Sequence, residues 1–250
     1  GTLAKIYDSF TKDANLNNIE FRNTLFEIKK KRDYMTLFID NIRLYKRVIK
    51  DVKSRDEKYV QKLLKDNDLL NLCSYYPEMK FIIFTNLEDT PIDDYIHKLI
   101  PQNVIRIFAV NAISWGGKVS PAFYGLKRKL TPNDNKLNLF RKMMELDIVP
   151  KKLLYINHNE KTHEKRLGLK KFFKNKSWAN VEFKRLDFES FLKNIYNHKF
   201  IICPRGNGID CHRNLEVIYL RRVPVMEKDN YLEELYKGIP ILWVKDFKDV

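Results

Sequence analysis

The second half of the chain alternates short apolar runs with amphipathic segments. From residue 152 onward, five apolar runs are separated by four segments with helical periodicity. This alternation is typical of a parallel sheet with helices on both faces. Because crossovers between parallel strands are right-handed, few topologies remain open. The expected strands are 153–157, 181–186, 200–204, 223–226 and 239–244, and the expected helices are 163–174, 188–197, 213–222 and 230–238.

The first half predicts a helical segment followed by a second α/β region. Residues 36–52 and 56–72 carry apolar side chains near a 3.6-residue period and predict helices. The runs 80–85 and 104–110 are almost wholly apolar and are typical of buried parallel strands. A helix is expected between them over residues 91–100.

The length of 250 residues suffices for one large domain or two smaller domains that share a cleft. The segment 147–150 separates the two α/β patterns and is the expected hinge. We therefore expect an N-terminal lobe over 1–148 and a C-terminal lobe over 149–250.

Composition limits the compartment and the class of partner. No apolar run reaches the roughly 18 residues of a membrane span, and the first residues lack the layout of a signal peptide. The three cysteines form no C-x-x-C pair, which argues against a disulfide scaffold or structural zinc. These features predict a soluble protein of a reducing compartment, the cytoplasm. The excess of Lys and Arg over Asp and Glu, 47 − 32 = +15, favours an anionic partner.

The segment 203–216, CPRGNGIDCHRNLE, carries the clearest functional pattern. It follows an apolar run and opens a helix, and ligands of open α/β sheets bind at such junctions. Arg205 and Arg213 could hold a diphosphate through charge-assisted hydrogen bonds. Arg213 and Glu216 are three residues apart and share one helix face, which pairs a cation for phosphate with a carboxylate for ribose hydroxyls.

Other residues of this segment have both a functional and a plain structural interpretation. Gly206 and Gly208 could let the backbone approach a ligand or adopt a positive φ, or they could simply form a turn. Asp210 could be a helix N-cap, and His212 is more often a packed or capping residue than a metal ligand. The combination of arginines, glycines and carboxylates within twelve positions favours a nucleotide site.

Residues 200–226, FIICPRGNGIDCHRNLEVIYLRRVPVM, resemble the donor-binding block of exostosin-like glycosyltransferases, including short members in bacterial glycan loci and large DNA viruses. Three further blocks are similar to that family: LLYINHNEKTHEKR (153–166), VIRIFAVNAISWGGKVSPAFYGL (104–126) and FTNLEDTPIDD (84–94). The chain departs from the family pattern at Leu215, where a Trp is usual, and at Leu220-Arg221, where Leu-Gly is usual. The second departure is expected to alter the donor pocket.

The resemblance implies a GT-B-like α/β fold, with two Rossmann-like lobes whose parallel sheets face a cleft. Arg205 and Arg213 would hold the donor diphosphate, Glu216 the ribose, and Arg166 would be a third phosphate ligand on the opposing loop. The implied donor-binding residues are Asn157, Asn159, Thr162, Arg166, Arg205, Gly206, Asn207, Gly208, Asp210, His212, Arg213 and Glu216.

Sugar transfer requires stabilisation of the leaving phosphate and a base for the acceptor hydroxyl. Arginines can supply the first, and no D-x-D follows an apolar strand, so we expect no metal and no cofactor. The expected base is Asp89, with Glu88 second; Asp93 and Asp94 are further carboxylates near this strand end. All four could instead be helix N-terminal residues.

The implied activity is transfer of a sugar from a nucleoside diphosphate, expected to be UDP, to an oligosaccharide or glycoprotein acceptor, with inversion. Xylose is the expected sugar, with rhamnose or fucose as alternatives, and a viral member would act in the host cytoplasm. Two other functions remain open. One is a nucleic-acid-binding protein, which predicts a contiguous basic stripe with exposed aromatics. The other is a nucleotide-sugar-binding module without catalysis.

Overall fold

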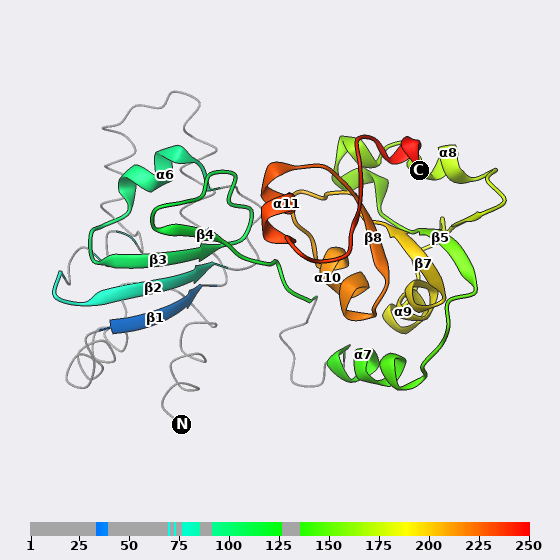
Figure 1. Ribbon diagram of the computed structural model, residues 1–250, viewed down its shortest axis with the longest axis horizontal. Helices are drawn as coiled ribbons and strands as arrows, with labels where there is room; N and C mark the ends of the chain where they lie inside the picture. Colours follow the sequence, from blue (N-terminus) through cyan, green and yellow to red (C-terminus); the bar gives the residue numbers. More distant parts are fainter. Residues whose placement is uncertain (1–33, 40–69, 71–72, 74–76, 86–91, 127–135) are drawn as a thin grey trace. The chain divides into compact units, whose positions relative to one another are not determined.

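The structure, a computed structural model, describes residues 34–39, 70, 73, 77–85, 92–126 and 136–250. These residues form an α/β fold with two parallel sheets (Figure 1). The chain divides into two compact units, 1–122 and 123–250. The α/β class and the parallel strands predicted from the alternation are confirmed, and the architecture is compatible with a Rossmann-like fold.

The first unit contains a four-stranded parallel sheet in the order β1-β2-β3-β4. Its core is formed by alternate residues of the central strands, such as Phe81, Ile83 and Ile107, which are at most 3% exposed. Phe84 and Phe108 stack with ring centroids 4.7 Å apart. The elements are β1 (Tyr34–Ile39), β2 (Lys80–Thr85), α6 (Asp94–Leu99), β3 (Val104–Ala109) and β4 (Val119–Pro121).

The helix predicted to begin at residue 36 is wrong for its first four residues. Residues 34–39 form β1, in which Leu37 pairs in parallel with Ile83 of β2. An apolar run of this length suits a strand and a helix alike, and here pairing with a neighbouring strand outweighs local periodicity. The rest of that predicted helix, 40–52, lies outside the described residues, as does most of the one predicted over 56–72.

The second unit contains a five-stranded parallel sheet in the order β6-β5-β7-β8-β9, and four of its strands, β5, β7, β8 and β9, are close to their predicted places. The strands are β5 (Lys152–Ile156), β6 (Ala179–Val181), β7 (His198–Ile202), β8 (Val223–Glu227) and β9 (Leu242–Val244). The helices are α7 (Lys136–Glu145), α8 (Leu169–Phe173), α9 (Phe188–Tyr196), α10 (His212–Tyr219) and α11 (Asn230–Leu235), with short 3-10 turns η1 (Glu160–Thr162), η2 (Glu164–Arg166) and η3 (Phe247–Asp249).

Two predicted elements of this unit differ in extent. The helix expected over 163–174 is divided into η2 and α8 by Gly168, whose φ of +73° is a left-handed conformation that interrupts a helix. The strand expected over 181–186 ends at Val181, because only residues 179–181 pair with β5.

The strand order creates a switch point between β5 and β7. After β5 the chain moves to one side to form β6, and it then returns to the other side to form β7. This is the 2-1-3-4-5 order of a doubly wound sheet, in which ligands bind outside the carboxyl ends of the strands where the order reverses. The residues that follow β5 and β7 are therefore the first place to look for a site.

The core of the second unit is built from alternate strand residues. Leu154, Ile156 and Ile202 pack with Phe173 of α8 and Phe247 of η3, and all five are at most 3% exposed. Alternate strand residues point to opposite faces, so Tyr155 and Ile201 line the other face of the sheet.

The division at residue 122 lies well before the hinge expected at 147–150. Helix α7 precedes that hinge yet packs in the second unit, where Phe140 contacts the rings of Phe188 and Tyr219 with centroid distances of 5.8 and 5.3 Å.

Within the residues described, no helix has the length and apolar character needed to cross a membrane.

Candidate functional site

Two loops meet at the switch point of the second sheet. The β5 loop comprises residues 157–168, and the β7 loop comprises residues 203–211 and ends where α10 begins. The β5 loop contains the polar segment 157–166, and the β7 loop contains the C-P-R-G-N-G block. The parallel sheet therefore brings two separate sequence motifs to adjacent strand ends.

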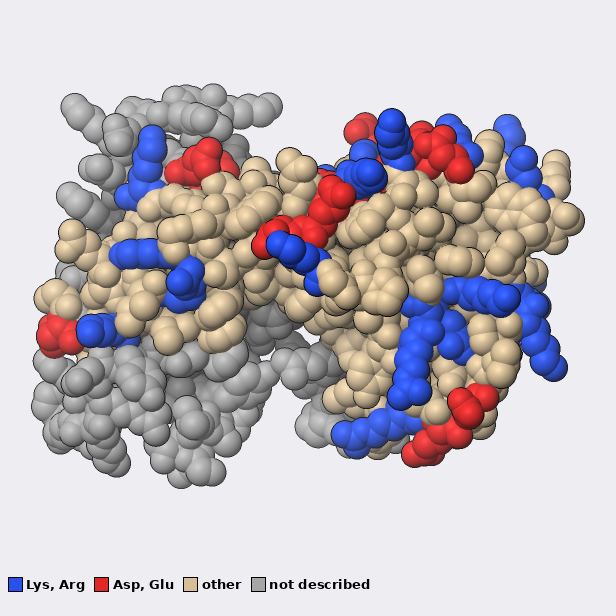
Figure 2. Space-filling view, viewed as in Figure 1, with Lys and Arg blue, Asp and Glu red and all other residues tan. Residues whose placement is uncertain are grey.

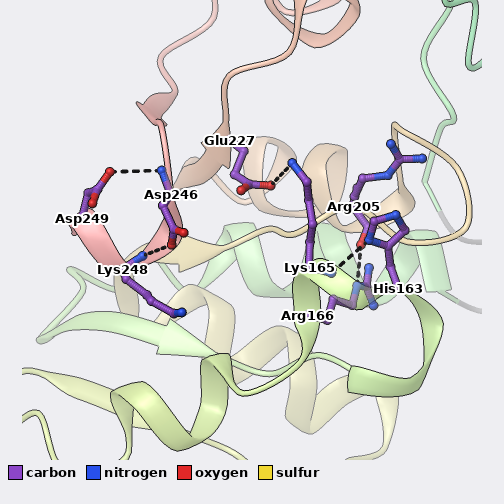
Figure 3. A network of polar contacts seen from close by, with 8 residues as sticks. All are labelled: His163, Lys165, Arg166, Arg205, Glu227, Asp246, Lys248 and Asp249. Atoms are coloured by element: carbon purple, nitrogen blue, oxygen red, sulfur yellow. Dashed lines mark hydrogen bonds and ion pairs between the residues drawn. The ribbon is translucent and has the colours of Figure 1, made fainter.

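Arg166 of the β5 loop contacts the main chain of the β7 loop directly. Its Nε donates a 2.6 Å hydrogen bond to the carbonyl of Arg205, and its Nη2 donates a 2.8 Å bond to the carbonyl of Pro204. The Arg166 side chain lies beside the main chain of Arg205 in Figure 3. Its third donor, Nη1, lies 3.4 Å from the carbonyl of Asn159. Arg166 is 8% exposed as a residue, and burial lowers the pKa of its guanidinium, yet each hydrogen bond described above is to a carbonyl.

Gly206 leaves the room that Arg166 occupies. A Cβ at position 206 would lie 3.2 Å from Nη2 of Arg166, tighter than an ordinary van der Waals contact. Gly206 and Gly208 are not among the glycines with positive φ. Positive φ is therefore not the reason for a glycine at position 206; its main chain instead lies close to the Arg166 side chain.

Arg205 and Arg213 are the two guanidinium groups of the β7 loop and the first turn of α10. Arg205 Nε and Arg213 Nη1 are buried and have no hydrogen-bond partner within the described part of the chain. Arg213 lies over the ring of Phe191 on α9, with its Cζ 5.2 Å from the ring centroid. Buried guanidinium donors with no acceptor are costly, so both side chains are suited to an anionic ligand.

Glu216 lies one turn after Arg213 on α10 and is 3% exposed. The segment that joins β7 to α10 and the first two turns of α10 thus carry two cations and a carboxylate. The remaining acidic group of this junction, Asp210, has a different role.

Asp210 holds the β7 loop to other parts of the second unit. Its Oδ1 accepts hydrogen bonds from the Tyr236 hydroxyl at 2.7 Å and from Asn214 Nδ2 at 2.8 Å, and its Oδ2 accepts one from the Tyr124 N–H at 2.8 Å. The expected alternative of an N-cap is wrong, because the N-cap of α10 is Cys211. Asp210 is 1% exposed, and both of its carboxylate oxygens accept hydrogen bonds from the protein. Among the residues expected to bind the sugar donor, Asp210 therefore has a structural role.

His212 has a similar structural contact. Its Nδ1 lies 2.8 Å from the carbonyl of Gly125, and its ring meets that of Tyr124 edge-on at 4.6 Å. Segment 123–126 is therefore anchored to the start of α10 by His212 and Asp210.

The polar residues of the β5 loop mostly stabilise the loop itself. Asn159 caps η1 by accepting from the Lys161 N–H at 3.1 Å, and Thr162 Oγ1 donates to the Asn159 carbonyl at 3.1 Å. Asn157 Nδ2 donates to the Tyr155 hydroxyl at 2.9 Å. Asn207 of the β7 loop is exposed.

Sequence reasoning missed His158. The ring is 2% exposed, and Nε2 donates to the carbonyl of Arg166 at 3.1 Å, which leaves Nδ1 as a buried acceptor without a hydrogen-bond partner among the described residues. The pKa of His158 is lowered to about 3, mainly by burial. The hydrogen bond to the Arg166 carbonyl raises the pKa, and the nearby cations Arg213, Arg166 and Lys170 lower it. The imidazole is therefore neutral at physiological pH.

Sequence reasoning also did not single out Lys170. It lies on the first turn of α8 and is 8% exposed, with Nζ 5.7 Å from the Phe183 ring centroid. Burial lowers the pKa of Lys170, Glu160 and Glu182 raise it, and Arg213 lowers it. The signal in the sequence was the position of Lys170 directly after Leu169, on the face of α8 that packs inward.

The catalytic candidates Asp89 and Glu88 lie outside the described residues. Of the other two carboxylates, Asp93 Oδ1 accepts from the Ile96 N–H at 3.3 Å, and Asp94 accepts a hydrogen bond from the Ser114 hydroxyl. Both carboxylates thus accept hydrogen bonds from the protein at the start of α6, in agreement with their interpretation as helix N-terminal residues.

The departure at Leu220-Arg221 lies at the other end of α10 from Arg213. The N–H of Arg221 bonds the carbonyl of Ile218 at 2.9 Å, and the N–H of Arg222 bonds that of Val217 at 3.1 Å. This is a Schellman motif, and Arg221 takes its left-handed position with φ +56°. Arg221 thus lies at a helix end, where its side chain is exposed.

Comparison with protein-family models gives no match, and comparison with curated proteins gives none either. Among the residues described, no group of three or more His, Cys, Asp or Glu side chains is placed to hold a metal ion.

Proposed function

We propose that the protein is a glycosyltransferase of GT-B type that uses a nucleoside diphosphate sugar. One observation carries the proposal: Arg205 on the β7 loop and Arg213 in the first turn of α10 follow the switch point of a doubly wound sheet, and each has a buried guanidinium nitrogen without a hydrogen-bond partner within the described residues. This is the position at which such sheets bind nucleotides. The resemblance of 200–226 to exostosin-like enzymes supports the same assignment.

In this proposal Arg205 and Arg213 bind the diphosphate and stabilise the charge that develops on it as the sugar leaves. Glu216 accepts hydrogen bonds from the ribose hydroxyls. UDP is the proposed nucleotide and xylose the proposed sugar, with rhamnose or fucose as alternatives. The phosphate charge is neutralised by arginines without a metal ion.

The acceptor is proposed to bind to the N-terminal lobe, whose sheet faces the donor lobe in a GT-B enzyme. Asp89, or Glu88 in second place, removes the proton from the acceptor hydroxyl as that oxygen attacks the anomeric carbon. The bond to the diphosphate oxygen breaks on the opposite side, and the configuration inverts. A carboxylate can serve as the base because it takes the proton in the transition state, while the bond between the acceptor oxygen and the anomeric carbon is forming.

The test is release of UDP from UDP-xylose and related UDP-sugars, measured with and without oligosaccharide acceptors and with and without Mg²⁺ or Mn²⁺. The proposal predicts turnover in the wild type and loss of turnover in Asp89→Asn with retained UDP binding. Retained turnover in both Asp89→Asn and Glu88→Gln would refute the assignment of the base. UDP binding without turnover on any donor would leave the non-catalytic module as the function.

One observation favours the nucleic-acid alternative. Phe172 and Phe183 are 37% and 57% exposed, and each lies under a lysine, at 5.3 Å from Lys176 Nζ and 5.7 Å from Lys170 Nζ. Against it, Lys and Arg on the face shown in Figure 2 occur in several separate groups with acidic and uncharged side chains among them. Binding of single-stranded RNA or DNA with a steep salt dependence, together with no nucleotide binding, would favour this alternative.

A further inference from the structure

Arg166 differs from Arg205 and Arg213 in what its guanidinium contacts. Arg205 and Arg213 each have a buried nitrogen without a partner among the described residues, whereas all three nitrogens of Arg166 bind main-chain carbonyls. Two of these carbonyls, Pro204 and Arg205, are consecutive in the β7 loop. The planar fork of a guanidinium can bind two such acceptors at once, and an ammonium cannot reproduce that geometry.

From these contacts we propose that Arg166 is a positioning residue of the diphosphate site, which fixes the β7 loop at Pro204–Gly206 and does not itself bind phosphate. The proposal rests on the function proposed above, and it replaces the expectation that Arg166 is a third phosphate ligand. Its effect on the ligand passes through Arg205, whose own main-chain carbonyl is the acceptor of the 2.6 Å bond.

Two neighbouring residues, Gly206 and His158, help to hold Arg166 where its side chain reaches the β7 loop. Gly206 leaves space for Nη2, since a Cβ there would lie 3.2 Å from it. His158 binds the main-chain carbonyl of Arg166 at 3.1 Å through Nε2. A continuous series of hydrogen bonds thus runs from the end of β5, through His158 and Arg166, to the main chain after β7.

The first experiment measures amide hydrogen exchange of residues 205–208 in the ligand-free protein. Arg166→Lys keeps the charge but loses the planar fork, so exchange of these amides should accelerate by about tenfold or more, the effect of losing a hydrogen bond to a charged group. Exchange in β8 should stay unchanged, which separates local loosening of the loop from global destabilisation. Arg185→Lys, at an exposed arginine, is the matched control. Unchanged exchange at 205–208 in Arg166→Lys would overturn the proposal.

The second experiment measures UDP affinity in Arg166→Lys, Arg166→Met and Gly206→Ala. A positioning role predicts that Lys and Met both weaken binding by about tenfold or more, because neither replaces the fork. It also predicts that Gly206→Ala weakens binding less in the Arg166→Lys background than in the wild type, since the clash with Nη2 is then absent. Near-wild-type affinity in Arg166→Lys with a large loss in Arg166→Met would show a phosphate ligand and overturn the proposal. If the wild type binds no nucleotide, the proposed function fails, while the exchange data still decide whether Arg166 holds the loop.

Discussion

The N–H of Tyr124 donates a 2.8 Å hydrogen bond to Oδ2 of Asp210, across 86 positions of sequence. The other oxygen of the same carboxylate accepts from the hydroxyl of Tyr236. Asp210 therefore ties the start of the second unit and the end of α11 to the loop that carries Arg205. Together these contacts give the buried aspartate of the C-P-R-G-N-G-I-D segment its hydrogen-bond donors.

Removal of the Asp210 carboxylate should destabilise the protein more than removal of any one of its donors. Asp210→Ala leaves three donors without this acceptor, and we expect a loss of about 3 kcal/mol or more in the free energy of unfolding. Tyr236→Phe removes one hydrogen bond and keeps the ring contact with Phe123, so a loss of about 1 kcal/mol is expected. Urea unfolding of both variants measures these values. Equal losses would contradict the role of Asp210 as the shared acceptor.

Arg221→Gly should stabilise the protein. Arg221 holds the left-handed position of the Schellman motif at φ +56°, which costs a non-glycine residue about 1 kcal/mol. Because glycine also loses more backbone entropy on folding, the expected net gain is about 0.5 kcal/mol or somewhat more. Arg221→Ala removes the same side chain but keeps the strain, and it is the matched control. Thermal unfolding of the two variants should differ, and a lower stability for Arg221→Gly would refute this account.

The neutral state of His158 predicts a pH dependence of stability. The pKa is about 3 in the folded protein and about 6.5 when unfolded, so between these values the unfolded state binds more protons. This contribution to stability is therefore fully present above pH 6.5 and is lost as the pH falls below it, with a slope of up to about 1.4 kcal/mol per pH unit. His158→Gln keeps a side-chain amide that can donate to the Arg166 carbonyl but does not titrate. Urea unfolding between pH 4 and 7 should show a shallower slope for His158→Gln than for the wild type; parallel slopes would contradict a neutral buried His158.

The strand–helix alternation predicted the second sheet well because each apolar run is short and bounded by a helix with its own period. The strand–helix junction that carries Arg205, Arg213 and Glu216 could be predicted for the same reason, because β7 and α10 both have a clear period. The first strand could not be told from a helix, since residues 34–39 become a strand only through pairing with β2. The contacts of Arg166 with Pro204 and Arg205, 38 and 39 residues away, and of Asp210 with Tyr124, 86 residues away, were also hidden, because sequence periodicity does not show which distant segments meet.

Equilibrium binding of UDP, GDP, ADP and CMP to the wild type, Arg213→Ala and Arg221→Ala tests the central claim most directly. Arg213 lies in the first turn of α10 and Arg221 follows its C-cap Leu220, so the second variant controls for the loss of one positive charge near the other end of the helix. The account predicts that one diphosphate binds the wild type without added metal, that Arg213→Ala weakens this binding by about tenfold or more, and that Arg221→Ala leaves it unchanged. No binding of any nucleotide, or equal binding to wild type and Arg213→Ala, would contradict a diphosphate site at the switch point.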